Sequence, residues 1–161
     1  MRIGIVSDSH GHVENCRPAV FMLESMEVEA VLHCGDVGTP EVLAQFAKWP
    51  LHFVLGNCDD PRTAWLSGKP AGSTITDHGR FGDLTLDIRR IALLHSDDAG
   101  KFRTVIRSGE YDLVCYGHTH VAKKETFGKT LVLNPGALYR ANRYSIAVYE
   151  TTTGEAEILW L

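Results

Sequence analysis

One pattern recurs five times in the chain and constrains the fold most. A short apolar run ends directly in a glycine or in a polar side chain that can bind metal. The runs are predicted to be buried strands. The residues that follow them are, in chain order, Asp8 and His10, Gly35 and Asp36, Gly56 and Asn57, His95, and Gly117, His118 and His120. In layered α/β domains, functional side chains gather outside the carboxyl ends of the strands. We therefore expect these residues to meet at one rim.

The last run, at residues 113–116, leads into two histidines that stand two positions apart. In an extended chain, residues i and i+2 point to the same side, so the imidazoles of His118 and His120 can reach one point. Gly117 allows the backbone to turn sharply and to approach what lies there. For this stretch alone, a polar loop that happens to contain two histidines is the alternative.

The first half of the chain alternates strands with helices. We predict strands over residues 2–7, 30–33 and 52–55, and helices over about 13–26 and 39–48. Thr39 is a plausible N-cap, and Pro40 suits the first helical position because its missing N–H has no partner there. Pro50 is expected to stop this helix. The alternation is typical of a layered α/β domain.

The second half is predicted to be mostly β. Residues 62–80 are interpreted as a loop with one short strand near 73–76, and Arg89 and Arg90 as the tight turn of a hairpin. A helix is expected over about 99–108, closed by Gly109. The remaining predicted strands are 113–116, 121–126, 129–133, 144–150 and a closing strand after the turn at 152–154. No linker or repeat divides the chain, so we predict one domain over residues 1–161.

Composition excludes several classes of protein. With 161 residues, 44% of them hydrophobic, the chain suits one globular domain with a real core. The formal net charge of -4 lacks the basic footprint of a nucleic-acid binder. No apolar run approaches the roughly 20 residues that span a bilayer, and the opening run is too short for a signal peptide. Four cysteines without CxxC spacing are expected to be free thiols, so we expect a cytoplasmic protein.

The predicted rim combines two carboxylates, four imidazoles and one amide. These donors suit divalent ions such as Mn, Fe or Zn, and the lack of a cysteine cluster argues against a structural zinc. Seven ligands are too many for one tetrahedral ion, but they fit two ions that share a carboxylate. His33 and His52 fall outside the motifs and are expected to form local hydrogen bonds within strands, and His78 is expected in a loop.

The five motifs resemble the calcineurin-like metallophosphoesterase superfamily, and most closely its small single-domain branch, the YfcE-like phosphodiesterases. That family shows D-x-H, G-D, G-N, a lone H and G-H-x-H in this order. The resemblance extends from Arg2 to the turn at Asn134, Pro135 and Gly136 and the strands after it. It implies an α/β fold of four layers, an αββα sandwich of two mixed β-sheets flanked by helices.

The resemblance also implies roles for the motif residues. One metal ion would be held by Asp8, His10 and His120, and a second by Asn57, His95 and His118, with Asp36 bridging the two. The implied cofactor is two divalent ions per chain, Mn first, with Fe, Zn or Ni as alternatives. The implied activity is hydrolysis of a small phosphodiester by a hydroxide that bridges the ions.

Two residues beside the motifs are predicted to assist this reaction. Cys58 stands where many members of the superfamily have a histidine that assists the leaving group, although a cysteine is usual in the small branch. Its alternative is a small buried hydrophobe. Asp59 would orient His10, and its alternative is an exposed carboxylate in a turn.

One departure from the family concerns substrate preference. The family reads H-G-H where this chain reads His95, Ser96 and Asp97, so a carboxylate replaces a cation that faces the phosphate. We predict that Asp97 disfavours doubly charged monoesters. The alternative is that Ser96 and Asp97 cap the following helix. Lys101 or Arg103 could supply the missing positive charge, and each is otherwise an exposed helix residue.

Two other functions fit less well. The retromer small subunit has the same fold and uses its surface to bind partners. Trp65 and Leu66 form an apolar pair in a predicted loop, which either packs inward or forms a partner surface, and a partner surface would favour such a role here. The intact metal positions argue against it. A nuclease is the second alternative, but larger relatives grip nucleic acid with extra domains that this chain lacks. A homo-oligomer is left open.

Overall fold

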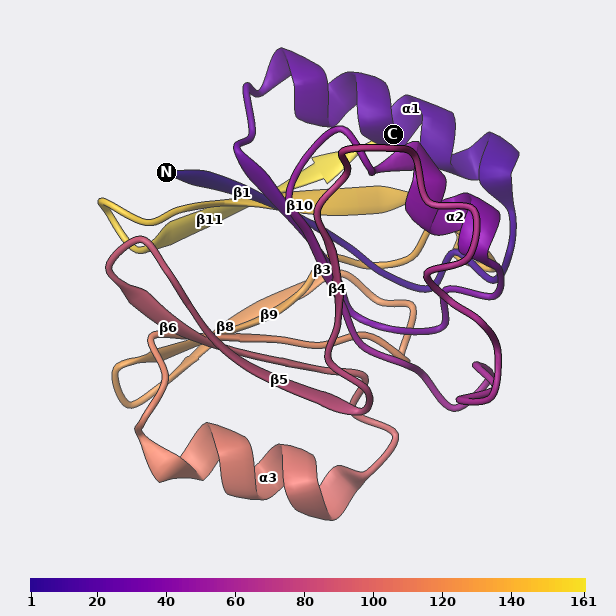
Figure 1. Cartoon of the computed structure of the whole chain (residues 1–161). Coiled ribbons are helices and arrows are strands. Elements are labelled where there is room, and N and C mark those ends of the chain that lie inside the picture. The colour runs from indigo at the N-terminus through magenta and orange to yellow at the C-terminus, as the bar shows by residue number, and fades with distance from the viewer.

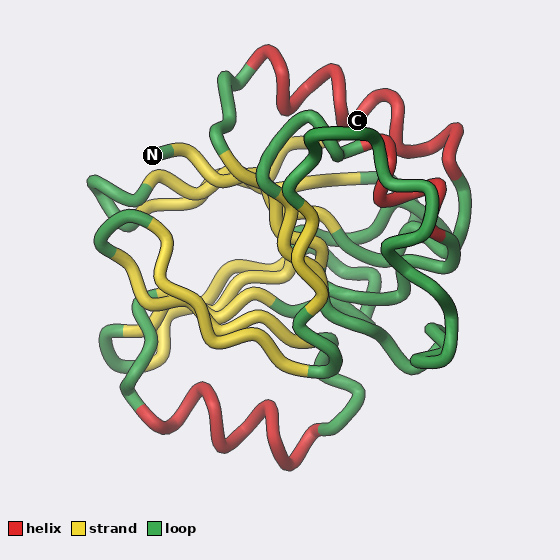
Figure 2. The backbone as a smooth tube through the Cα atoms, viewed as in Figure 1, coloured by secondary structure: helices red, strands yellow, loops and turns green.

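Two β-sheets packed face to face, with helices on their outer faces, make up the computed structural model, which describes residues 1–161 (Figure 1). Helices α1 (Val13–Ser25) and α2 (Pro40–Gln45) cover the six-stranded sheet, and α3 (Ala99–Ser108) covers the five-stranded sheet. Figure 2 shows the four layers as helix, sheet, sheet and helix. The predicted αββα sandwich is confirmed.

The six-stranded sheet has the order β11-β10-β1-β2-β3-β4. Its strands are β1 (Arg2–Val6), β2 (Ala30–His33), β3 (Leu51–Phe53), β4 (Ile75–Asp77), β10 (Ser145–Glu150) and β11 (Glu155–Trp160). Strands β1 to β4 are parallel, whereas β10 and β11 are antiparallel to their neighbours. Parallel neighbours need crossover connections, and α1 and α2 provide the first two.

The five-stranded sheet has the order β5-β6-β7-β9-β8. Its strands are β5 (Phe81–Leu86), β6 (Arg89–Leu94), β7 (Leu113–Cys115), β8 (Lys123–Phe127) and β9 (Thr130–Asn134). Helix α3 connects the parallel strands β6 and β7. It ends at Gly109, whose φ of 66° places it in the left-handed region that glycine adopts without strain.

The alternation of β1 fixes both interfaces of the six-stranded sheet. Ile3 and Ile5 belong to the core between the two sheets, while Val6 packs with Leu23 of α1 on the other face. Successive strand residues point to opposite faces, so a strand covered on both sides reads as a continuous apolar run. Gly4 lies against Leu23, where a Cβ atom would collide. The first strand of the sequence is therefore central.

Two predicted features differ from the observed ones, the end of helix α2 and the position of a hairpin turn. Helix α2 ends at Gln45 rather than near residue 48. The next residues form backbone hydrogen bonds to the third residue before them instead of the fourth, such as Phe46 N–H to Leu43 O at 3.1 Å. The hairpin turn lies at Asp87 and the residue after it rather than at the two arginines, which start β6. Asp87 adopts a φ of 54°, a region that aspartate tolerates better than most residues. The short strand expected near 73–76 is β4.

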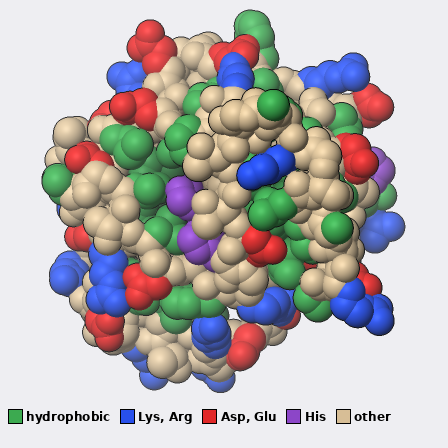
Figure 3. Space-filling view, viewed as in Figure 1, with side chains coloured by type: hydrophobic (Ala, Val, Ile, Leu, Met, Phe, Trp, Pro, Cys, Tyr) green, Lys and Arg blue, Asp and Glu red, His purple; other side chains and the backbone are tan.

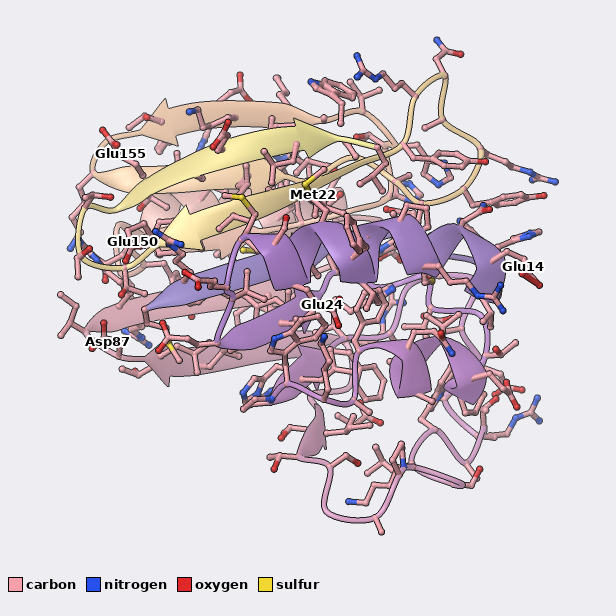
Figure 4. The ribbon with its side chains drawn as sticks, turned by 90° about the horizontal axis from the view of Figure 1, so that it is seen from above. Glu14, Met22, Glu24, Asp87, Glu150 and Glu155 are labelled. Atoms are coloured by element: carbon pink, nitrogen blue, oxygen red, sulfur yellow. The ribbon has the colours of Figure 1, made fainter.

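The parallel strands of both sheets end at the same end of the molecule, where the loops gather (Figure 2). Figure 4 shows Glu14, at the start of α1, at this end. Asp87, Glu150 and Glu155 lie at the opposite end. The predicted functional residues therefore lie beside the start of α1. None of the three helices is long and apolar enough to cross a membrane.

His33, the last residue of β2, is fully buried and only half satisfied. Its Nε2 lies 2.8 Å from Ser9 Oγ, and Ser9 Oγ donates to Val37 O at 3.2 Å. The Nδ1 atom has no hydrogen-bond partner. Burial lowers the pKa of His33 to about 3, because a second ring proton would have no acceptor. The expectation of a locally bonded histidine is thus met at one nitrogen only. Two further histidines outside the motifs pair with each other, His52 Nδ1 lying 3.0 Å from His78 Nε2.

We predict that His33→Gln makes folding less sensitive to acid. The unfolded chain protonates His33 near its ordinary pKa of 6.5, whereas the folded chain does so only near 3. The stability that a neutral His33 contributes is therefore fully present above the higher value and is lost as pH falls towards the lower one. Between pH 7 and about pH 4, the free energy of unfolding of the wild type should fall by about 3 kcal/mol more than that of the variant, as measured by urea unfolding.

The control for this comparison is His12→Gln, at the exposed N-cap position of α1. It should follow the wild type at both pH values. A free-energy difference between wild type and His33→Gln that stays constant with pH would show that His33 is not responsible.

Candidate metal centre

Loops after five strands carry the predicted site residues to one end of the molecule. They are Asp8 and His10 after β1, Asp36 after β2, Asn57 after β3, His95 after β6, and His118 and His120 after β7. Gly117 packs so closely against Ser7 and Asp8 that a Cβ atom would collide, and Gly56 packs in the same way against Asp36. Because the two glycines lack a side chain, their backbone can lie directly against side chains of loops that follow other strands.

The backbone at this end is strained. Positive φ angles occur at Asp8 (54°), His10 (47°), Asp36 (51°), Ser96 (76°), His118 (78°) and His120 (57°). Non-glycine residues adopt this region at a cost of about 1–3 kcal/mol each, and they persist where the surrounding structure imposes them. Such residues cluster at functional sites, so their concentration here supports a binding centre.

Asp8, His10 and His120 form the first convergent group. The Nε2 atoms of the two histidines lie 3.3 Å apart, and His120 Nε2 lies 3.2 Å from Asp8 Oδ1. His120 Nδ1 is 3.3 Å from Arg140 O and donates its hydrogen there, which leaves a lone pair on Nε2. This lone pair faces a carboxylate oxygen, so a cation between them would satisfy both.

Asp8, Asp36 and His95 form a second group. His95 is buried, and its Nδ1 donates to Cys34 O at 2.9 Å. Its Nε2 has no hydrogen-bond partner and faces Asp36 Oδ2 at 3.2 Å and Asp8 Oδ1 at 3.9 Å. A buried lone pair pointed at two carboxylates requires either a proton or a metal ion. The donor set of nitrogen and oxygen atoms fits a divalent metal.

Asp36 lies between the two groups. Its Oδ2 is 3.2 Å from His95 Nε2 and 3.6 Å from His10 Nε2. Burial acts to raise the pKa of Asp36, but His95 and the backbone N–H of Cys58 outweigh it and hold that pKa below its usual range. Burial raises the pKa of Asp8. For His95, burial lowers the pKa, yet Asp36 and Asp8 raise it more, so the net pKa is raised. Both carboxylates thus favour positive charge at the centre.

Asn57 and His118 lie at the open rim, where both are exposed, and His118 belongs to none of the convergent groups. His118 N–H donates to Asp8 Oδ2 at 3.1 Å, and its ring centroid lies 5.1 Å from that of His95. Asn57 stands between Gly56, which packs on Asp36, and Cys58, whose N–H donates to Asp36 Oδ1 at 2.9 Å. The structure therefore places both residues next to the two convergent groups described above.

Cys58 is exposed, so its alternative as a small buried hydrophobe is wrong. Its Sγ accepts a hydrogen bond from Asn57 Nδ2 at 3.4 Å and forms a third convergent group with His10 and Asp36. Partial burial and the charge of Asp36 raise the pKa of this thiol. Cys58 therefore stays protonated at neutral pH and can donate a proton at the rim.

Asp59 holds the loops of the centre together. Its carboxylate is buried and accepts three backbone hydrogen bonds, from Val37 at 3.1 Å and from Gly38 and Gly56 at 2.8 Å. The alternative of an exposed turn carboxylate is wrong. The structure gives Asp59 these backbone partners rather than a hydrogen bond with His10, so it positions the loops on either side of Asp36.

We predict that Asp59→Asn destabilises the fold by about 2–3 kcal/mol, since the amide group would face backbone N–H groups and leave buried donors unpaired. Urea unfolding measures the loss. Asp60→Asn is the matched control because Asp60 is exposed and bonds Arg62 outside the centre. Equal stability of the two variants would contradict the role given to Asp59.

The environment of Asp97 differs from that of the predicted helix cap. The N-cap of α3 is Asp98, which accepts from Lys101 N–H at 3.0 Å, so the capping alternative for Asp97 is wrong. Asp97 instead forms an ion pair with Arg80, which also donates to Leu55 O at 3.2 Å. Asp97 and Arg80 line a hollow of about 220 Å³ together with His95 and Lys101.

Arg80 is a residue that the sequence did not indicate. It follows Gly79 in the loop before β5, and no spacing links it to the motifs. The cation near His95 thus comes from a distant loop, although Lys101 shares the hollow. Arg103 is exposed on α3 and lies outside that lining.

Comparison with known proteins adds independent findings. Residues 1–154 match the calcineurin-like phosphoesterase superfamily domain. Phosphodiesterase MJ0936 of Methanocaldococcus jannaschii is 34% identical over 141 residues, covering 84% of this chain and 83% of that protein. A solved structure of an archaeal phosphodiesterase superposes with a TM-score of 0.86 at 31% identity, over 100% of both chains.

A third similarity concerns the fold alone. The structure of Vps29 from Entamoeba histolytica in complex with Zn²⁺ superposes with a TM-score of 0.66 and covers 100% of this chain and 98% of that one. Its sequence identity is 17%, which carries information on architecture but not on activity.

Proposed function

The chain belongs to the calcineurin-like phosphoesterase superfamily, and we propose that it hydrolyses small phosphodiesters with two divalent metal ions held at the centre described above. It is a metal-dependent phosphoesterase. The observation that carries the proposal is the convergence of imidazole nitrogens on two buried carboxylates, above all the unpartnered Nε2 of His95 beside Asp36.

The proposed ligands divide between the two ions. Asp8, His10 and His120 would hold the first, and the structure groups them within ligand distance of one another. Asn57, His95 and His118 would hold the second, and Asp36 would bridge them because its Oδ2 faces His10 on one side and His95 on the other. We propose Mn, with Fe, Zn or Ni as alternatives, because nitrogen and oxygen donors suit all four.

Bound divalent ions would lower the pKa of a water molecule and offset the charge of the phosphate. The protein's own residues position these groups. Asp59 fixes the loops on both sides of Asp36 through backbone hydrogen bonds. Cys58, exposed and protonated, is placed to donate a proton to a leaving oxygen at the rim. Asp8 and Asp36 bring only two negative charges, so two divalent ions leave the centre positive and attractive to a phosphodiester.

The alternatives have less support. Trp65 is buried in the core, so of the apolar pair that would favour a scaffold only Leu66 is exposed. A nuclease would need a basic surface, and Figure 3 shows acidic and basic side chains interspersed over the visible face. We propose a single domain over residues 1–161, supported by the core shared between both sheets. We also propose a cytoplasmic location, supported by four free cysteines.

We predict that Asp36→Asn loses more metal and more activity than Asn57→Ala, because a bridging residue contacts both ions. Protein purified without chelator should contain close to two equivalents of transition metal. After stripping and addition of Mn, the wild type should hydrolyse bis(p-nitrophenyl) phosphate, and Asp36→Asn should be at least about a hundredfold slower.

Asp60→Asn is the control for this comparison and should keep both properties. One tightly bound zinc without activity, or unchanged metal content in Asp36→Asn, would refute the bridged two-ion centre.

The Asp97–Arg80 ion pair leads to a prediction about substrate charge. Because Arg80 offsets Asp97, the pair disfavours monoesters less than a lone carboxylate would. Asp97→Asn leaves Arg80 unpaired beside His95, so kcat/KM for p-nitrophenyl phosphate should rise about tenfold relative to bis(p-nitrophenyl) phosphate. Arg80→Gln should shift this ratio in the opposite direction. Equal changes in kcat/KM for both esters would show that the ion pair does not interact with the charge of the substrate.

A further inference from the structure

A hollow of about 510 Å³ opens beside His120, between the loop that follows β7 and the loop that precedes β10. Its lining includes His120, Val121, Arg140, Asn142, Arg143 and Trp160. Small-molecule sites have volumes of roughly 300–1,000 Å³. Since His120 belongs to the group with Asp8 and His10, a molecule in this hollow would adjoin the metal centre.

The hollow is positively charged in a protein that is acidic overall. Arg140 and Arg143 both line it, and neither has a carboxylate within ion-pair distance, whereas Arg80, Arg89 and Arg90 all do. No aspartate or glutamate contributes to the lining. Guanidinium groups bind phosphate through two parallel hydrogen bonds, so this pair of unpaired cations favours an anionic ligand.

Trp160 gives the hollow an aromatic surface. Its side chain is 45% exposed, while the other two tryptophans, Trp49 and Trp65, are 8% and 5% exposed. The guanidinium of Arg143 lies 5.4 Å from the centroid of the Trp160 ring. An exposed aromatic ring beside arginine is the arrangement on which bases of nucleotides stack.

The loop that carries both arginines is fixed to the metal centre. Arg140 O accepts the hydrogen of His120 Nδ1 at 3.3 Å, and Arg140 itself adopts a φ of 49°. A left-handed conformation at a long side chain is costly and marks a segment that its surroundings hold in place. The backbone at Arg140 therefore keeps a set position relative to His120.

We propose that this hollow binds one ester arm of the substrate, and that the arm carries an aromatic base and a further phosphate, as in a dinucleotide. The base stacks on Trp160, and the second phosphate pairs with Arg140 and Arg143 while the scissile phosphate lies at the metal centre. This inference rests on the proposed function, because it names the substrate class of that same centre.

Competitive inhibition tests the inference on Mn-loaded enzyme with bis(p-nitrophenyl) phosphate as the reporter substrate. The probes are ribose 5-phosphate, AMP, which adds a base, and adenosine 3′,5′-bisphosphate, which adds a second phosphate. Each addition should lower the inhibition constant about tenfold, because the base stacks on Trp160 and the second phosphate forms charged hydrogen bonds with the arginines.

Substitutions of two residues show which residue is responsible for each decrease in the inhibition constant. Trp160→Leu should abolish the advantage of AMP over ribose 5-phosphate, while Trp160→Phe should retain most of it. Arg143→Gln should reduce the advantage of the bisphosphate over AMP by about tenfold. The matched controls are Phe127→Leu, an exposed aromatic residue of β8, and Arg103→Gln, an exposed arginine of α3 without an ion pair. Both should behave as the wild type.

The outcomes separate the inference from the proposed function. Failure of the Mn-loaded wild type to hydrolyse bis(p-nitrophenyl) phosphate would contradict the function. Hydrolysis with equal inhibition by AMP and ribose 5-phosphate would overturn the inference alone. The same holds if Trp160→Leu weakens both inhibitors to the same extent, because the ring then supports the loop rather than the base.

Discussion

The burial of Asp8 and Asp36 beside one another is the constraint on which the rest of this end of the structure depends. Two carboxylates removed from water are costly unless hydrogen bonds and positive charge compensate them. Backbone N–H groups of His118 and Cys58 supply part of that compensation. The bond from His118 to Asp8 joins loops from different sheets, so this compensation of Asp8 is available only when the sheets pack with the ends of their parallel strands together. The αββα arrangement is therefore linked to the chemistry of the centre as well as to its core.

The strained backbone around the centre follows from the same constraint. Loops from several strands must bring their side chains to one point within a few residues of each strand end, and the left-handed conformations of Asp8, Asp36 and His120 accomplish this. Such residues destabilise the fold locally. The two sheets offset that cost elsewhere through buried residues such as Ile5 and Leu93, which pack between them. Stability thus arises mainly between the sheets, and the strained residues lie at the ends of their strands.

Features encoded locally could be predicted from the sequence, and features created by tertiary contact could not. Apolar runs and the residues directly after them identified the strands, the helix that closes at Gly109, and the cluster around Asp36, because each depends on neighbours in the chain. The partner of Asp97 could not be predicted, since Arg80 comes from a loop without periodicity. The choice between Asp97 and Asp98 as the cap depended on a single hydrogen bond to Lys101. A one-residue ambiguity of this kind lies within the usual uncertainty of helix ends.

The positive groups near the centre differ in how they are held, and this difference bears on selectivity. On the side of His95, Arg80 is paired with Asp97, so its net field is small. On the side of His120, Arg140 and Arg143 are unpaired and adjoin an exposed indole. Because the whole chain is acidic, an anion approaching it experiences attraction mainly where cations lack partners. An elongated ester with a second charge beyond the scissile phosphate can exploit that side, whereas a compact monoester contacts only the metal centre. In the proposed reaction, the asymmetry of these arginines would therefore favour diesters through attraction at a distance from the reacting atoms rather than through repulsion beside them.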